Sequence, residues 1–448
     1  MRRNILAGIS AALAALMFTS PATAQSPSGS PADVAALELK SQEALEAEKW
    51  VSFYSTNMKL HQLLPYEPKY LVNVVKACGM LDRKSTAYHY MLQIQQQGVT
   101  YDFNADDETL KIRNTEAYQH INNMLIDAAK PSGEGTTAFT LQGSGQDYRA
   151  LAWDPSREAF LAGTVEEGVL LTVTESGEAE VLLKANEENG LWSITGLAVD
   201  VKNNRLWVAS SATPHFKGFS AADKNRSALF EFDLNSIELL GRYNVPVDGL
   251  DHALGTVAIT EEGHVYVIDR ATPIIYAKLP GSDRLEAVFA SPGTRALDSI
   301  TVTPDNSRVF VSDAVKGVLV IDPVARQARM LTGPETMNLG GIESISYRDR
   351  QLYVVQGRFT PPRIVRLELD SSGAGATSVS PMAIALDPFD QPGVGTIRGD
   401  NLYYLANAGA GDESGATVMS TPLAAGAEAT PPRVIDNSKA ITPQEKQE

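Results

Sequence analysis

Apolar positions along the chain follow two different periods. From residue 33 to about 130 they return every three to four positions with few glycines or prolines, as in "DVAALELKSQEALEAEKWVSFYSTNMKLHQLL". This period predicts amphipathic helices. After residue 135, short runs rich in Val, Ile, Leu and Tyr alternate with Gly, Asp, Asn and Pro turns, which predicts antiparallel strands. The chain therefore divides into a helical segment, 33–130, and a β domain, 136–436.

Within the helical segment, the stretch "PYEPKYLVNVVKACGML" begins with prolines, continues as a helix and reaches a turn near Gly79. A second helix follows and carries Tyr88 and Met91. Proline before the first helix, small residues at close crossings and an aromatic in the second helix resemble a tetratricopeptide-type hairpin. A last helix is expected from Glu116 to Ala129, and Pro131 with "SGEG" marks the domain boundary.

The β domain repeats one pattern six times: strand, tight turn, strand, variable loop and two weaker strands. The repeats are anchored at spacings of 46, 60, 43, 45 and 51 residues on Leu151, Leu197, Val257, Ile300, Ile345 and Thr396. Six units of four antiparallel strands predict a six-bladed β-propeller, in which radial repetition protects the sheet edges. Residues 136–143, "TTAFTLQG", are expected to supply an outer strand that closes the ring with the last blade. Two stacked sandwiches explain the spacing less well.

The N-terminus carries the pattern of a secretory signal peptide. A basic start, an apolar run and the small residues Ala22-Thr23-Ala24 predict a signal peptide over 1–24 with cleavage after Ala24. The expected location is therefore periplasmic or secreted. A Pro/Ser linker is expected over 25–32 and a flexible tail over 437–448.

Charge and cysteine content narrow the classes of partner. The formal net charge is −16. An acidic chain without basic clusters repels phosphate backbones and anionic lipid, so nucleic acid and membrane surfaces are poor candidates for partners. No stretch after the signal peptide is long and apolar enough for a membrane span. The single cysteine, Cys78, lies in an apolar helical pattern and is predicted to be a buried hydrophobe.

Loop lengths indicate which face of the propeller binds ligands. Turns between the first and second strands of each repeat, such as "VKNN" and "EEGH", are short, whereas the connections at the other end include the long loop 210–227. Antiparallel order places the start of each first strand, the end of each second strand and these long loops on one face. Long loops on a rigid scaffold are where binding usually occurs, so the channel mouth on this face is the predicted site.

At this mouth, the position two residues before each anchor is occupied by Arg149, Thr195, Gly255, Asp298, Glu343 and Val394. Asp298 and Glu343 are the two carboxylates of this ring and are the candidate metal ligands, with Ca²⁺ as the candidate ion. The ligand-binding candidates are Arg149, Thr195, Ser210, His215, Asp269, Asp313, Gln356 and Asn407.

Each of these residues also has a structural interpretation. Asp298 and Glu343 could instead cap strand entries by accepting hydrogen bonds from backbone amides. His252, with its neighbour Asp251, is the best-placed imidazole for proton transfer, but a histidine bonded to a loop carbonyl is the alternative. No HExxH, CxxC or GxSxG motif is present in the sequence. The sequence therefore carries no motif typical of a metalloprotease, a thiol redox protein or a serine hydrolase.

The segments "ITGLAVDVKNNRLWVAS", "DHALGTVAITEEGHVYVID" and "LDSITVTPDNSRVFVSD" resemble the gluconolactonase, regucalcin and paraoxonase-like group of six-bladed propellers. The resemblance is closest to secreted bacterial members with a tetratricopeptide-like segment before the propeller. It implies a divalent cation, often calcium, at the channel mouth and hydrolysis of lactones or esters. The resemblance also implies a glutamate on the first blade, where this chain has Arg149, and amides on middle blades, where it has Thr195 and Gly255.

Two functional hypotheses follow. The first is a binding module whose mouth takes a small polar ligand or peptide and whose helical segment docks a partner protein. The second is a divalent-metal-dependent hydrolase of lactones or esters, with Asp298 and Glu343 holding the cation and His252 activating water. The missing first-blade ligand favours the first hypothesis.

Overall fold

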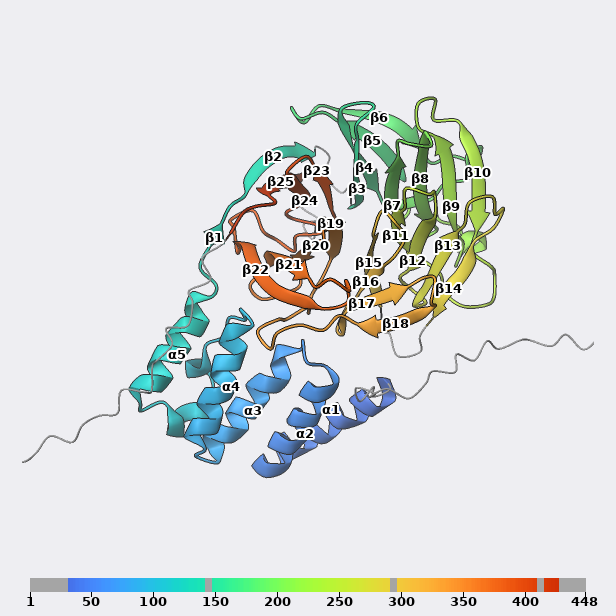
Figure 1. The fold of residues 1–448 in the computed structure, drawn as a ribbon. Coiled ribbons are helices and arrows are strands. Elements are labelled where there is room, and N and C mark those ends of the chain that lie inside the picture. Colours follow the sequence, from blue (N-terminus) through green and yellow to red (C-terminus); the bar gives the residue numbers. More distant parts are fainter. Residues whose placement is uncertain (1–30, 142–146, 291–295, 409–414, 427–448) are drawn as a thin grey trace, which may run out of the picture.

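The computed structural model describes residues 31–141, 147–290, 296–408 and 415–426, and these form a six-bladed β-propeller with helices packed against one side (Figure 1). The predicted fold class is therefore confirmed. The predicted signal peptide, the tail and most of the linker lie outside the described residues. The first helix begins at Pro31, two residues before the predicted start of the helical segment.

The helical segment consists of five α-helices in successive antiparallel pairs, with short 3-10 helices between the last two. Cys78 is fully buried in the shared core, as predicted, and burial raises the pKa of its thiol to about 11. Pro68 begins one helix, where its missing N–H costs nothing, and the Thr115 hydroxyl caps another by accepting from the Tyr118 amide. The helices are α1 Pro31–Glu46, α2 Trp50–Leu63, α3 Pro68–Met80, α4 Lys84–Gln96, η1 Phe103–Ala105, η2 Asp107–Ile112 and α5 Glu116–Asp127.

Each of the first four blades is formed by four consecutive strands, with the first strand innermost. Blade 1 has β3 Tyr148–Asp154, β4 Ala159–Thr164, β5 Val169–Val173 and β6 Ala179–Lys184. Blade 2 has β7 Ser193–Asp200, β8 Arg205–Ser211, β9 Ser227–Asp233 and β10 Leu239–Asn244. Blade 3 has β11 Leu254–Ile259, β12 Val265–Asp269, β13 Ile274–Lys278 and β14 Glu286–Ala290. Blade 4 has β15 Leu297–Val302, β16 Val309–Asp313, β17 Gly317–Asp322 and β18 Gln327–Met330.

The last two blades take strands from both ends of the β domain. Blade 5 has β19 Ser344–Arg348, β20 Gln351–Gln356, β21 Arg363–Leu369 and β22 Ala376–Ile384, and the short β1 Ser132–Gly133 adds to its edge. Blade 6 has β23 Gly395–Arg398, β24 Asn401–Leu405 and β25 Ala416–Pro422, and its outer strand is β2 Thr136–Leu141. The predicted ring closure by residues 136–143 is therefore confirmed over β2.

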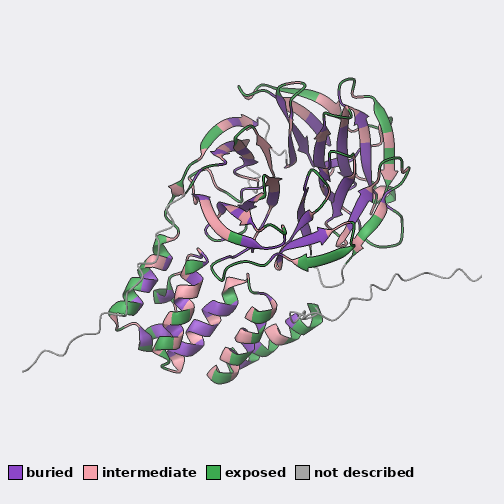
Figure 2. Ribbon diagram, in the orientation of Figure 1, coloured by how far each residue is buried: buried purple, intermediate pink, exposed green. Residues whose placement is uncertain are grey.

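The core lies between adjacent blades rather than in one central volume. In blades 1 to 4 most residues of the inner and middle strands are buried, whereas outer strands such as β10 and β14 face solvent (Figure 2). Apolar clusters span neighbouring blades; one joins Leu161 and Leu170 of blade 1 to Leu206 and Phe230 of blade 2. This burial between rigid sheets holds each inner strand at a fixed distance from the propeller axis.

The helical segment packs on the mouth face of the propeller, over blades 4 and 5. Phe359, from the β20–β21 loop, is buried in the apolar core of the helical segment, and Tyr66 packs into the apolar cluster of blades 4 and 5. The Thr100 amide donates to the Thr360 carbonyl at 3.2 Å. The segment therefore covers part of the face that the sequence predicted to bind ligands.

A buried polar network joins the two parts of the chain. The fully buried Arg363 donates from Nη1 to the Gln97 carbonyl at 2.9 Å and from Nε to Gln356 Oε1 at 2.7 Å. Asn338 Nδ2 donates to Gln97 Oε1 at 3.1 Å. A Cβ at Gly98, whose φ is +75°, would collide with the Arg363 guanidinium, so glycine at this turn permits the close approach.

No described helix is long and apolar enough to cross a membrane.

Candidate functional site

A β-bulge at the start of the inner strand presents the mouth residues of blades 1 to 4. The pairing of the first and second strands shifts between Tyr148 and Ala150, between Ile194 and Gly196, between Leu254 and Val257, and between Leu297 and Ile300. The positions inside these bulges include the mouth residues predicted by the repeat alignment. A bulge inserts an unpaired residue and re-aims its side chain, which explains how strand-entry residues reach the mouth.

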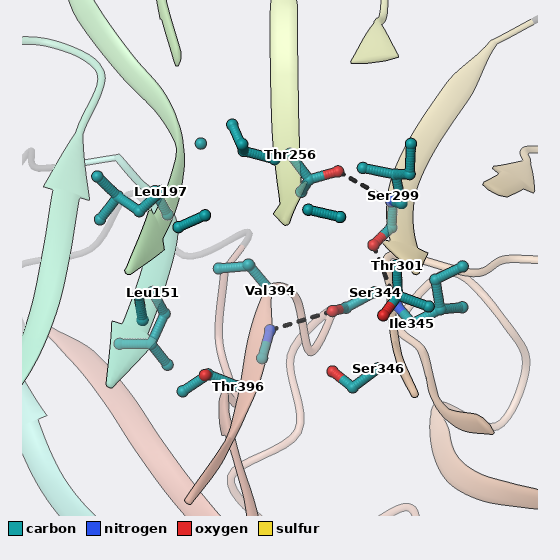
Figure 3. A pocket seen from close by; sticks show the side chains of 18 of the residues that line it. Leu151, Leu197, Thr256, Ser299, Thr301, Ser344, Ile345, Ser346, Val394 and Thr396 are labelled. Atoms are coloured by element: carbon teal, nitrogen blue, oxygen red, sulfur yellow. Dashed lines mark hydrogen bonds between the residues drawn. The ribbon is translucent and has the colours of Figure 1, made fainter. Parts of the chain in front are cut away.

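Below the mouth, the inner strands surround a cavity of about 310 Å³. Its lining combines apolar side chains with hydroxyl groups, and several of these hydroxyl groups are engaged by neighbouring blades (Figure 3). Thr256 accepts from the Ile300 amide at 3.0 Å, Ser299 from the Ile345 amide at 3.1 Å, and Ser344 from the Gly395 amide at 3.2 Å. These three hydroxyl groups therefore join one blade to the next.

The mouth itself contains three guanidinium groups, one buried carboxylate, Asp298, and one partly buried carboxylate, Glu343. Asp298, whose side chain is 4% exposed, accepts from Arg270 at 3.1 Å and from Arg358 at 2.8 Å, with a different oxygen for each. Arg358 Nε also contacts Glu343 Oε1 at 2.5 Å. Arg149 lines the channel cavity and pairs with Asp147 at 2.7 Å. The predicted neighbours Asp298 and Glu343 are therefore brought together, but through a shared arginine.

Burial raises the pKa of Glu343, although the positive charge of Arg358 opposes this effect. Asp298 raises the same pKa further, while Arg270 and Arg149 lower it. The mouth arginines, Arg149, Arg270 and Arg358, and the mouth carboxylates, Asp298 and Glu343, therefore form one electrostatic unit.

These residues do not fit a divalent cation. A calcium ion takes six to eight oxygen ligands, but both Asp298 oxygens and one Glu343 oxygen are already occupied by guanidinium groups. In the part of the chain that the structure describes, no group of three or more His, Cys, Asp or Glu side chains is placed to hold a metal ion. The metal-dependent hydrolase is therefore not favoured by this geometry.

Comparisons with known proteins give structural matches only. No protein-family model and no curated protein matches the sequence. A gluconolactonase from Xanthomonas campestris is 13% identical, covers 65% of this chain and 94% of its own, and superposes with a TM-score of 0.45. A protein of unknown function from Bacteroides thetaiotaomicron is 12% identical, covers 65% and 76%, and gives 0.47. A luciferin-regenerating enzyme is also 12% identical, covers 66% and 97%, and gives 0.46.

His252 lies below the mouth surface between two carboxylates. Its Nδ1 is 2.6 Å from Asp269 Oδ2 and its Nε2 is 3.0 Å from Asp248 Oδ1. The side chain is 1% exposed. Asp251 is exposed, and its carbonyl accepts from the Thr272 hydroxyl. Both imidazole nitrogens are therefore engaged inside the protein, an arrangement that fixes the 246–252 loop to blade 3; a catalytic role for His252 and Asp251 stays a prediction.

We expect His252 to make stability depend on pH. Burial by itself lowers the pKa of His252, but the hydrogen bonds to Asp269 and Asp248 outweigh it, so the pKa lies above its ordinary value. The folded state then binds the proton more tightly, and this stabilisation is complete below pH about 6.5 and is lost as pH rises through the folded pKa. The difference in unfolding free energy between wild type and His252→Gln, measured by urea denaturation from pH 5.5 to 9, should shrink as pH rises. A difference that stays constant across this range would contradict the assignment.

Most of the other predicted ligand-binding residues have their polar atoms engaged within the protein. Thr195 donates to the Leu254 carbonyl of the next blade, Ser210 accepts from the Trp192 amide, and Asp313 accepts from the Val315 and Lys316 amides. Asp269 accepts from the amides of Ala253, Ala271 and Thr272. Gln356 belongs to the interdomain network, Asn407 pairs with Gly415 and Thr417, and His215 is exposed on the β8–β9 loop.

Arg270 and Arg358 were not among the predicted site residues. Both follow the end of a second strand, in "IDRAT" and "VQGRFT". The second strand of each blade ends at the mouth. A search for basic residues one or two positions after these strand ends would have found both arginines.

Proposed function

We propose that the protein is a binding module and that the propeller mouth takes a small polar ligand bearing an oxyanion, such as a carboxylate. The observation that carries this proposal is the way in which the mouth arginines are held. Each guanidinium is anchored along one edge by a carboxylate, while their side chains remain 41%, 35% and 43% exposed for Arg149, Arg270 and Arg358. Among the described residues, the Nη1 groups of these three arginines make no hydrogen bond.

Anchored arginines with unused donors suit oxyanions for two reasons. The planar guanidinium presents paired N–H groups that match carboxylate oxygens, and charge-assisted hydrogen bonds are stronger than neutral ones. The anchoring carboxylates also reduce the entropy that the arginines lose when a ligand binds, because they restrict the side chains beforehand.

The test is isothermal titration calorimetry with a panel of mono- and dicarboxylates, aldonic acids and matched neutral polyols. We expect a carboxylate to bind to the full chain and the double variant Arg149→Gln, Arg270→Gln to weaken it on the order of 100-fold, since each charged hydrogen bond contributes about 1.5–3 kcal/mol. Asp298 keeps Arg358 as a partner in this variant, so the fold should persist. Arg284→Gln, an exposed arginine paired with Glu286, is the matched control. Binding that is equal in both variants, or absent from the whole panel, would refute the proposal.

The predicted periplasmic or secreted location belongs to the same proposal. A small-molecule binding module outside the cytoplasm agrees with the N-terminal pattern of residues 1–24. N-terminal sequencing of the mature protein should begin at Gln25 if Ala24 precedes the cleavage site.

The helical segment retains a proposed role in binding a partner protein. Leu39, Leu45 and Val51 are exposed apolar residues in the α1–α2 region of this segment. The test is a pull-down that compares wild type with the double variant Leu39→Asp, Val51→Asp. Both substitutions lie on the surface, so the variant should stay folded. Loss of a captured protein in this variant would support the role, and equal capture by both would contradict it.

A further inference from the structure

A second concave surface lies between the helical segment and blade 5, apart from the channel. It encloses about 480 Å³, compared with about 310 Å³ for the channel cavity. We call it the interdomain cleft; its side chains come from the start of α3, the 99–101 stretch and the β20–β21 loop. Those that matter for its chemistry are Tyr66, Lys69, Lys76, Tyr101, Arg358 and Phe359.

The walls of the interdomain cleft are rigid. On the propeller side, Gln356 Nε2 donates to the Asn338 and Gly340 carbonyls and fixes the backbone that lines the cleft. A Cβ at Gly340 would lie 2.5 Å from the Tyr66 carbonyl, so the two walls approach as closely as the backbone permits. Arg363 stacks over the Phe359 ring at 3.8 Å. The cleft is therefore preformed, which reduces the entropic cost of binding.

One part of the lining is aromatic. Three aromatic residues, Tyr66 and Tyr101 of the helical segment and Phe359 of the propeller, are among those that line the cleft. Burial raises the pKa of the Tyr66 hydroxyl to about 12, so this group stays protonated at neutral pH and is a donor. Among the described residues it has no hydrogen-bond partner. Aromatic side chains bind planar rings through offset or edge-to-face contacts.

The other part of the lining is cationic. Lys76 is held by Asp106 at 2.7 Å, and Tyr101 donates to the other oxygen of the same carboxylate at 2.9 Å. Lys69 pairs with Glu38 at 2.9 Å and is half exposed. Arg358 adds a guanidinium at the boundary with the mouth, and Glu67 is the one acidic residue of the lining. This combination favours an anion over a cation or a metal ion.

We propose that the interdomain cleft is a second binding site and that it takes a small aromatic anion, a planar ring carrying a carboxylate. The ring lies between the aromatic walls and the carboxylate accepts from the lysine ammonium groups and the Tyr66 hydroxyl. The proposal stands independently of the mouth site, because the two share only Arg358.

The probe is 4-hydroxybenzoate, titrated calorimetrically into the full chain. Two analogues separate the two recognition elements: cyclohexanecarboxylate keeps the charge without the aromatic ring, and 4-hydroxybenzyl alcohol keeps the ring without the charge. We expect 4-hydroxybenzoate to bind with a dissociation constant below about 1 mM, and both analogues to bind on the order of tenfold more weakly.

Variants distinguish the interdomain cleft from the mouth. Lys69→Gln removes a partly exposed ion pair that contributes little to stability, and Lys76→Met keeps the aliphatic stem of its lysine; each should weaken 4-hydroxybenzoate on the order of tenfold, while Arg149→Gln should not. If Arg149→Gln alone weakens the probe, the anion binds at the mouth and the cleft proposal is overturned. Equal affinity for all three probes, or no binding to a wild-type protein that binds other carboxylates at the mouth, would overturn it too.

Discussion

Arg363→Met is expected to lower the free energy of unfolding by about 2–4 kcal/mol and to loosen the helical segment from the propeller. The substitution removes a fully buried guanidinium and leaves the Gln97 carbonyl and Gln356 Oε1 without their donors. Each buried acceptor that loses its partner costs about 1–3 kcal/mol. Methionine fills most of the aliphatic volume, so a cavity contributes little to the loss.

The guanidinium itself is costly to bury, which limits the expected loss. Burial lowers the pKa of Arg363 to about 9, a value that leaves it charged at neutral pH. Among the described residues its hydrogen-bond acceptors are Gln356 Oε1 and the carbonyls of Gln97 and Asn338, none of which is a carboxylate. The Phe359 ring at 3.8 Å offsets part of this cost through a cation–π contact. The net effect is therefore smaller than the sum of the lost hydrogen bonds.

Limited proteolysis and urea denaturation together measure this prediction. Endoproteinase Glu-C should cut after Glu134, at the domain boundary, faster in Arg363→Met than in wild type, because loosened helices no longer help to hold the boundary segment against β22. Arg366→Met is the matched control: it lies on the same strand, β21, and donates to the Leu423 carbonyl away from the helices. We expect it to cost about 1 kcal/mol. Similar losses in both variants would mean that Arg363 has no special part in docking.

The propeller could be predicted from the sequence because its repeats are local. Each unit contains its own alternating strands and tight turn, so the anchors from Leu151 to Thr396 recur at nearly constant spacing whatever the rest of the chain does. The strand that closes the ring could also be predicted. The sequence of β2 is a single strand pattern before the first repeat, and the last repeat needs a fourth, outer strand next to β25.

The docking of the helical segment could not be predicted in the same way. An amphipathic helix reveals that it has a buried face but not which surface covers it. The propeller residue that enters the helical core, Phe359, stands alone in the loop "GRFTPP" without any periodicity. The sequence therefore pointed to a partner protein, while the structure shows that part of the helical surface is already used by the propeller.

The sequence predicted the carboxylates of the candidate site but not its arginines Arg270 and Arg358. Register alone placed Asp298 and Glu343 beside each other on neighbouring blades, and both lie at the mouth. Their partners Arg270 and Arg358 were missed because an arginine side chain extends several ångströms beyond its backbone position, so its target depends on the tertiary arrangement. The same holds for His252 and Asp269: both were singled out, but their hydrogen bond follows only from the pairing of Leu254 with Asp269.

The strongest test of the mouth is the double variant Arg270→Gln, Arg358→Gln, which we expect to lose about 3–5 kcal/mol of stability at neutral pH and to gain a response to calcium. The two substitutions leave the buried Asp298 and the partly buried Glu343 without their closest positive charges, and removing one side of a buried ion pair has a cost of this size. The freed oxygens are hard ligands, so millimolar CaCl₂ should raise the melting temperature of the double variant by several degrees.

Wild type should show no such response, because the guanidinium groups already occupy the oxygens that a cation would need. Thermal unfolding with EDTA and with CaCl₂, together with metal analysis of the purified protein, measures both sides of the comparison. Arg149→Gln is the control, since it removes a mouth arginine but leaves both pairs to Asp298 intact. If calcium raised the melting temperature of wild type as much as that of the double variant, the ion would displace the arginines from the carboxylates. Asp298 and Glu343 would then be metal ligands, as the sequence predicted. Because the same two carboxylates anchor the arginines in one case and hold a cation in the other, this comparison decides whether the mouth attracts anionic or metal-bound ligands.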